Sequence, residues 1–234
     1  MNYPEGVILN INKPYGWTST DVVRKLKNRL KTIGFPKIKI GHAGTLDPLA
    51  TGVLLVCIGK STKKVTELQS QNKEYIFTVE LGATTVSFDL EHPIDERYPT
   101  EHITPEMVLK YVQSLPGDID QVPPAYSAKR IGGKRAYELM RDGKEVELKT
   151  CPVTIYEAEL LDYTAPHAKI RVTCSKGTYI RSIARDMGLD LKSGGYLTEL
   201  TRTQNGGYNI QNGLDLDNMD TFMPLNETNQ PQST

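Results

Sequence analysis

The apolar positions along the chain predict mainly β-strands. Residues 53–58 form an uninterrupted apolar run, which is typical of a strand buried on both faces. Residues 73–81 alternate instead, with Tyr75, Phe77 and Val79 on one face and mostly polar residues on the other, as in a half-buried strand. Three further strands are expected over residues 7–11, 153–161 and 168–174.

Helical spacing is confined to shorter segments. Apolar residues recur every three or four positions between 22 and 30, with Ser19 or Thr20 as the expected N-cap and Gly34 at the end. Another helix is expected after Thr104, because the following Pro is tolerated at the first helical position. Shorter helices are expected after Ser61 or Thr62, at 134–141 and after Thr178, and loops over 82–103 and most of 117–149.

One stretch, Gly41 to Leu54 with the sequence GHAGTLDPLATGVL, places histidine, aspartate and proline among glycines directly before the buried strand. Glycine permits backbone conformations that are costly for other residues, and Pro48 restricts its own φ and the conformation of Asp47. An isolated Leu-Asp-Pro string is more typical of an ordinary turn. The whole stretch favours a rigid loop that presents His42 and Asp47 beside the core.

The net charge of the 234-residue chain is zero, but the charges are unevenly distributed. Basic residues gather without acids at 24–39, which holds seven of them, and again at 60–64 and 129–135. One such cluster is best explained as a solvated face, whereas three around the glycine-rich loop favour a phosphate-binding surface. The expected phosphate contacts of the third cluster are Lys129, Arg130, Lys134 and Arg135.

Cysteine content and hydropathy bear on the compartment. Three cysteines, an odd number, fit a reducing cytosol better than a disulfide framework. No apolar run reaches the length of a membrane span, and the first residues show no signal-peptide pattern. We therefore expect a cytoplasmic protein without membrane association, with a disordered polar tail at 229–234.

The stretch 41–54 resembles the catalytic motif of the TruB family of tRNA pseudouridine synthases, in which the aspartate is the nucleophile. The Lys-Pro-x-Gly-x-Thr-Ser string from Lys13, the string ending at Arg181 and residues 197–203 resemble further motifs of this family, in the same order. By this resemblance Asp47 is the catalytic nucleophile, and Arg181 keeps its carboxylate ionised. The resemblance implies substrate-binding roles for Lys13, His42, Tyr75, Arg181 and Leu200.

The resemblance assigns these residues different tasks. Tyr75 stacks on the target uracil, Leu200 lines the base pocket, and His42 helps to fill the space from which the base departs. Lys13 either supports its motif structurally or helps to hold the substrate. In an insertion near 123–149, basic side chains are interleaved with tyrosines. The resemblance implies that this insertion grips the RNA, and the alternative is an ordinary surface loop.

The resemblance also implies a fold and a reaction. We expect an α+β pseudouridine synthase fold with a mixed, largely antiparallel sheet, forming one catalytic domain over residues 1–228 and lacking the usual C-terminal RNA-binding domain. The implied activity isomerises uridine 55 in the T loop of tRNA by base flipping and nucleophilic catalysis. No cofactor, metal or guide RNA is expected, the partner is the T arm of tRNA, and the protein is expected to be a monomer.

Two other classes of function remain open from the residues alone. A non-catalytic tRNA-binding or folding module would share the basic surface but would not need Asp47 together with Arg181. A metal-dependent hydrolase could use His42 and Asp47, but it would need a third ligand close to them in the sequence pattern.

Overall fold

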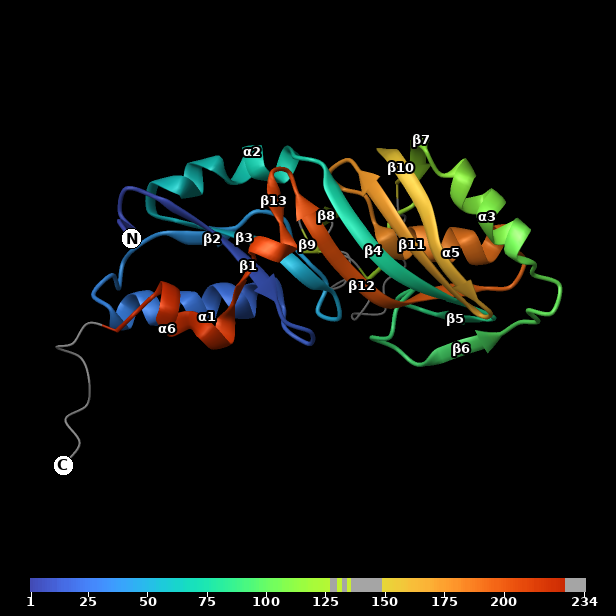
Figure 1. Cartoon of the computed structure of the whole chain (residues 1–234), viewed down its shortest axis with the longest axis horizontal. Helices are drawn as coiled ribbons and strands as arrows, with labels where there is room; N and C mark the ends of the chain where they lie inside the picture. The colour runs from blue at the N-terminus through green and yellow to red at the C-terminus, as the bar shows by residue number, and fades with distance from the viewer. Residues whose placement is uncertain (127–129, 132–133, 136–148, 226–234) are drawn as a thin grey trace, which may run out of the picture. The chain divides into compact units, whose positions relative to one another are not determined.

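The computed structural model describes residues 1–126, 149–225 and, as backbone, the strand residues 130–131 and 134–135. The chain divides into two compact units, one formed by residues 1–73 with the chain from 201 onward and the other by residues 74–200. Figure 1 shows their helices and strands. Strand β12 (Gly195–Asn205) begins in the second unit and ends in the first. The expectation of a single domain over 1–228 stays a prediction.

The first unit is built on β3 (Thr51–Ile58), which pairs antiparallel with β1 (Val7–Lys13) along its full length. Figure 1 draws α1 (Ser19–Thr32) and α2 (Val65–Ser70) on opposite sides of this pair. Its other strands are β2 (Ile40–His42), antiparallel to β3; the end of β12, parallel to β3; β13 (Tyr208–Asn209), antiparallel to β12; and β14 (Leu214–Asp215), parallel to β1. Short 3₁₀ segments cover Gly59–Lys64, Ile210–Asn212 and Leu216–Asn218.

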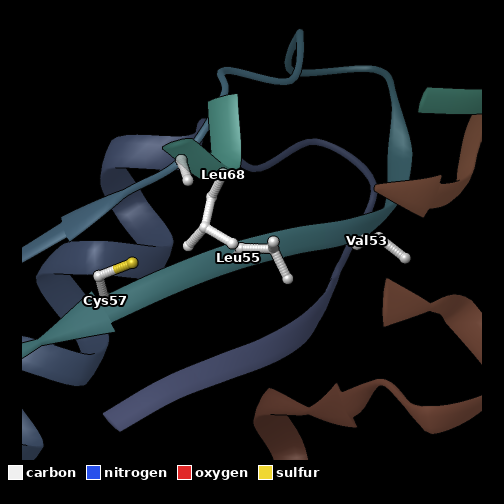
Figure 2. Close-up of a cluster of buried hydrophobic side chains, with 5 residues drawn as sticks. Val53, Leu55, Cys57 and Leu68 are labelled. Carbon is white, nitrogen blue, oxygen red and sulfur yellow. The ribbon is translucent and has the colours of Figure 1, made fainter. Parts of the chain in front are cut away.

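Apolar packing beneath the glycine-rich loop comes from one face of β3. Val53, Leu55 and Cys57 alternate along the strand and therefore share a face, and Leu68 of α2 packs against them (Figure 2). Ala43, the residue after His42, belongs to the same buried cluster. The continuous apolar run predicted as a buried strand is confirmed, because every residue from 52 to 58 is buried.

The N-cap of α1 is Thr18, one residue before the first of the two predicted caps. The Thr18 hydroxyl accepts from the Asp21 amide, and the Asp21 carboxylate accepts from the Thr18 amide, which together form a capping box. The prediction of Ser19 or Thr20 as N-cap is therefore wrong. The Ser19 hydroxyl is used elsewhere, because it contacts the main chain of Leu46.

The second unit is a largely antiparallel sheet in the order β12–β4–β11–β10–β7. Strand β4 (Lys73–Leu81) alternates between buried and partly buried residues, as its sequence pattern predicts. The mixed, mostly antiparallel sheet with flanking helices confirms the expected fold class. The other elements are β7 (Gly117–Gln121), β10 (Cys151–Thr164), β11 (His167–Cys174), α3 (Pro105–Ser114) and α5 (Ile180–Asp190).

Several local predictions in the second unit need correction. Residues 82–103, expected to form a loop, contain a hairpin of β5 (Ala83–Thr85) and β6 (Ile94–Arg97), whose strands are too short to show a hydrophobic period. Thr178 is not the N-cap of α5, because its hydroxyl donates to the Ser175 carbonyl and the cap position falls on Tyr179. Residues 134–135 form β9, paired with β8 (Arg130–Ile131), and the rest of the helix expected at 134–141 lies outside the described residues.

The described C-terminal segment packs on the first unit. Strand β14 extends the sheet beside β1, and α6 (Met219–Phe222) follows it. Phe222 and Met223 are buried, and the Arg29 side chain of α1 donates from Nε to the Met223 carbonyl at 2.7 Å. The tail predicted at 229–234 lies outside the described residues. Within the described chain, none of the helices combines the length and apolar character needed to cross a bilayer.

Candidate active site

The loop between β2 and β3 carries Asp47 and is closed by main-chain hydrogen bonds. The Ala43 amide donates to the Leu55 carbonyl at 2.8 Å, so the loop leaves the sheet directly after β2. The Ala50 amide donates to the Asp47 carbonyl at 3.1 Å, which defines a turn that starts at Asp47. The aspartate thus lies at the first position of a turn, immediately before a strand.

Both sequence neighbours of Asp47 are held by other elements of the first unit. The Ser19 hydroxyl accepts from the Leu46 amide at 2.9 Å. The Pro48 carbonyl accepts from the Gly16 amide and from Lys13 Nζ, each at 3.0 Å. Because these bonds fix the main chain on either side, they limit the positions that the Asp47 side chain can reach.

Lys13 is completely buried, and its ammonium group faces main-chain carbonyls. Besides the Pro48 carbonyl, Nζ donates to those of Pro14 and Trp17, at 3.0 and 2.5 Å. Burial lowers the pKa of Lys13 to about 8, against the opposing effect of the Asp47 carboxylate, and the charge of Arg202 lowers it further. These contacts support the structural alternative for Lys13, in which it joins the Lys-Pro motif to the catalytic loop.

The shifted pKa of Lys13 predicts how stability depends on pH. The pKa is about 8 in the folded protein against an ordinary 10.5, so the unfolded chain binds this proton more tightly between these values. The stability that Lys13 contributes should therefore rise as the pH increases through this range and stay constant below it. Urea unfolding of wild type and Lys13→Met, from neutral pH to about pH 10, measures the difference. The expectation would be contradicted if the free energy of unfolding of wild type, relative to that of Lys13→Met, fell as the pH rises.

His42 is partly buried at the end of β2, which favours the neutral form of its imidazole. Burial lowers its pKa below the usual value, the charge of Arg202 lowers it further, and a hydrogen bond to the Gly44 backbone opposes both effects. A neutral ring can occupy the space beside a nucleic-acid base without placing a second cation close to Asp47. Lys13, His42 and Asp47 all belong to the first unit, and the charge of Asp47 acts on Lys13.

Arg181 lies in the second unit, on the first turn of α5, and is almost completely buried. Its Nε lies 3.7 Å from the Asp89 carboxylate, which is buried as well. One terminal nitrogen, Nη1, donates to the carbonyls of Ser87 and Tyr126, at 3.2 and 3.0 Å. Sequence reasoning did not identify Asp89 as a partner, because nothing in the acidic segment around it distinguishes it from neighbouring acids.

The remaining predicted substrate-binding residues also lie in the second unit. Tyr75 is on the buried face of β4, and Leu200 is partly buried in the middle of β12. The predicted pairing of Arg181 with Asp47 joins residues of different units and stays a prediction. Of the predicted phosphate contacts, Lys129 lies outside the described residues, and the side chains of Arg130, Lys134 and Arg135 do as well.

The structure modifies the picture of the basic cluster at 24–39. The Arg29 side chain pairs with Asp220 and the Met223 carbonyl, so the C-terminal segment occupies it. Lys25 lies over the Trp17 ring, with Nζ 5.3 Å from the ring centroid. The cluster residues with exposed side chains are Arg24, Lys27, Lys31, Lys37 and Lys39.

No group of three or more His, Cys, Asp or Glu side chains in the described part of the chain has a geometry suited to a metal ion. Among these residues, the third ligand that a hydrolase built on His42 and Asp47 would need is not found. The first unit thus holds one carboxylate, that of Asp47, in a loop with a fixed main chain, and the buried ammonium group of Lys13 lies within reach of its charge. Such a site can supply a nucleophile to a substrate that needs no activated water.

Comparison with known proteins identifies the family. Residues 28–180 match the model of the TruB family pseudouridylate synthase N-terminal domain. The tRNA pseudouridine synthase B of Bacteroides fragilis is 54% identical over 92% of this chain and 93% of its own. The enzyme of the same name from Phocaeicola vulgatus is 51% identical over 97% of both chains.

A solved structure agrees with this family at the level of the fold. The crystal structure of a Cbf5-Nop10-Gar1 complex matches with a TM-score of 0.73 at 27% identity, over 99% of this chain. The match spans 59% of the length of that solved chain. The sequence motifs, the sheet topology and the similar relatives all indicate the same family. The chain belongs to the TruB family of pseudouridylate synthases.

Proposed function

We propose that this protein isomerises uridine to pseudouridine in tRNA, at uridine 55 of the T loop. One observation carries the proposal: Asp47 lies in a loop whose main chain is held on both sides, in a chain 54% identical to a tRNA pseudouridine synthase B. TruB-family membership accounts for the position in the tRNA. Cytoplasmic location, a monomeric state and independence from guide RNA belong to the same proposal.

The chemistry explains why a single carboxylate is enough. Pseudouridine formation breaks the bond between N1 and C1′, turns the uracil and joins C5 to C1′, without consuming water. Hydrolytic glycosidases need two carboxylates, one of which activates water or attacks while the other protonates the leaving group. An isomerase can use one nucleophilic carboxylate, and we assign that role to Asp47. Attack at C6 of the base and attack at C1′ of the sugar are both compatible with it.

The other residues bind and orient the flipped nucleotide. Extrusion of the target base from the RNA costs a few kcal/mol, which contacts to the base and the vacated space must offset. Tyr75 is assigned to stack on the uracil, Leu200 to line its pocket and His42 to fill the space left by the base. The lowered pKa of His42 supports this assignment, because a neutral ring packs against bases without a large desolvation cost.

A reconstituted reaction tests the proposal and its alternatives. Purified protein is incubated with an unmodified tRNA transcript, without other proteins or guide RNA, and pseudouridine is mapped by chemical derivatisation. We expect complete conversion at uridine 55, unchanged by excess EDTA when a short T-arm stem-loop replaces the tRNA. Binding without product would favour the non-catalytic module. Activity that EDTA abolishes and zinc restores would favour a metal-dependent reaction.

The exposed basic side chains of α1 predict the salt dependence of RNA binding. Lys27 and Lys31 are exposed on this helix, and each phosphate contact should contribute about 0.7–0.9 to the slope of log affinity against log salt. We expect the double change to Gln at these positions to flatten that slope by about 1.4–1.8. Fluorescence anisotropy over a salt series measures it, with Lys110→Gln on α3 as control. An unchanged slope would remove α1 from the RNA surface.

A further inference from the structure

Arg202 combines a large side chain with almost complete burial, since only 1% of the residue is exposed. It lies on the part of β12 that pairs in parallel with β3, directly opposite Gly52. A Cβ atom on Gly52 would lie 2.2 Å from the Arg202 carbonyl oxygen, and the φ of Gly52 is +96°. Only glycine allows the two strands to approach so closely here, so the main chain of Arg202 is fixed against the end of the catalytic loop.

The side chain of Arg202 reaches both ends of that loop. Its Nε donates to the Val53 carbonyl at 2.7 Å, and Nη2 donates to the Gly44 carbonyl at 3.1 Å. Gly44 precedes Asp47 by three residues and Val53 follows it by six, so one planar guanidinium group connects the entry and the exit of the loop. A guanidinium fork fixes the directions of two bonds at once, which an ammonium group cannot do.

The Gly44 backbone connects Arg202 to His42 as well. The Gly44 carbonyl accepts from Arg202, and the backbone of the same residue raises the pKa of His42, against the larger lowering by burial. The placement of His42 and that of Asp47 therefore both depend on the position of the main chain around Gly44. Asn205, three residues further along the chain, contacts the preceding carbonyl of Ala43 at 3.4 Å.

We propose that Arg202 is a positioning residue for the reaction. It sets the spacing between the two ends of segment 44–53, which contains most of the catalytic loop and the first residues of β3, and thereby the placement of Asp47 and His42. The inference rests on the proposed role of Asp47 as nucleophile. Arg202 does not touch the reacting atoms in this scheme. It acts only through the carbonyls of Gly44 and Val53.

The test compares Arg202→Lys with Arg202→Met, and uses Arg171→Lys, an exposed residue of β11, as matched control. The Lys variant keeps the buried charge but cannot span both carbonyls. We expect its kcat on a T-arm stem-loop to fall about 100-fold, because small displacements of a reacting group cost that much. The dissociation constant for the RNA should stay within about threefold of wild type, and the control should match wild type in both quantities.

Hydrogen exchange provides a readout that does not depend on activity. In Arg202→Lys, amides of residues 43–53 should exchange about tenfold faster, while those of α5 and β10 keep their wild-type rates. Faster exchange throughout the chain would overturn the proposal, and so would a wild-type kcat in the Lys variant. It would also be overturned if the Met and Lys variants lost kcat only in proportion to their loss of thermal stability. Failure of the wild-type protein to form pseudouridine would refute the proposed function, while local exchange would still report whether Arg202 fixes the loop.

Discussion

Replacing Asp47 with Asn is expected to lower the rate of pseudouridine formation by at least about 10⁴-fold, the scale seen when a catalytic nucleophile is removed. The amide has nearly the same shape but cannot form the covalent intermediate. The bonds that hold the neighbours Leu46 and Pro48 involve their main-chain atoms, so the loop should keep its conformation. RNA affinity should therefore stay within about threefold of wild type, because the change removes a transition-state interaction.

Single-turnover kinetics and anisotropy measure these two quantities on the same T-arm stem-loop. Asp190→Asn, an exposed change at the end of α5, controls for the loss of one negative charge. The circular dichroism and melting temperature of both variants should match wild type within a few degrees. Turnover by Asp47→Asn at a rate close to wild type would show that another group is the nucleophile.

Replacing Arg181 with Met is expected to have the second largest effect, a loss of about 10²–10³-fold in kcat together with a lower melting temperature. The guanidinium is buried beside Asp89, so its removal leaves a carboxylate without its cation in a desolvated place. Breaking a buried ion pair from one side typically costs about 3–5 kcal/mol of stability. The Ser87 and Tyr126 carbonyls would lose their donor as well.

Two further variants separate the catalytic part of this effect from the structural part. Arg181→Lys should regain most of the stability but only part of the activity, since an ammonium group cannot reproduce the geometry of the fork. Asp89→Asn keeps the guanidinium and neutralises only the Asp89 carboxylate, so it should lower kcat less than Arg181→Met does. Full activity in Arg181→Lys would show that charge alone is required at this position, and it would weaken the predicted pairing with Asp47.

Local patterns predicted the parts of the fold where burial repeats regularly. The alternation in β4 and the apolar run in β3 follow directly from which faces are buried, and both strands were correctly predicted. The hairpin of β5 and β6 was missed, because its short strands are held by pairing and carry no hydrophobic period. In α3 the buried residues are Val108 and Val112, whereas the apolar Met107 is 37% exposed, so an apolar residue in a helix does not by itself mark the buried face.

The parts of the site formed by neighbouring residues could be predicted from the sequence, whereas contacts between residues far apart in the chain could not. The glycine-rich loop and its aspartate could be recognised because all of its residues are adjacent in the sequence. The contacts of Arg181 with Asp89 and of Arg202 with Gly44 join residues far apart in the chain, so no spacing rule could reveal them. The pairing of Arg29 with the C-terminal segment was missed for the same reason, and it removes one cation from the surface expected to bind RNA.

The short strand β14 has a consequence for handling the protein. It occupies part of the outer side of β1, where Ile11 and Asn12 pair with Leu214 and Asp215. A strand edge that is left open offers its amides and carbonyls to any other chain with an extended segment, which is a common route to aggregation. A chain truncated before residue 214 would uncover this edge and would lose the buried side chains of Phe222 and Met223. Such a truncated chain should therefore express mainly as insoluble material, even though every residue assigned to catalysis would still be present.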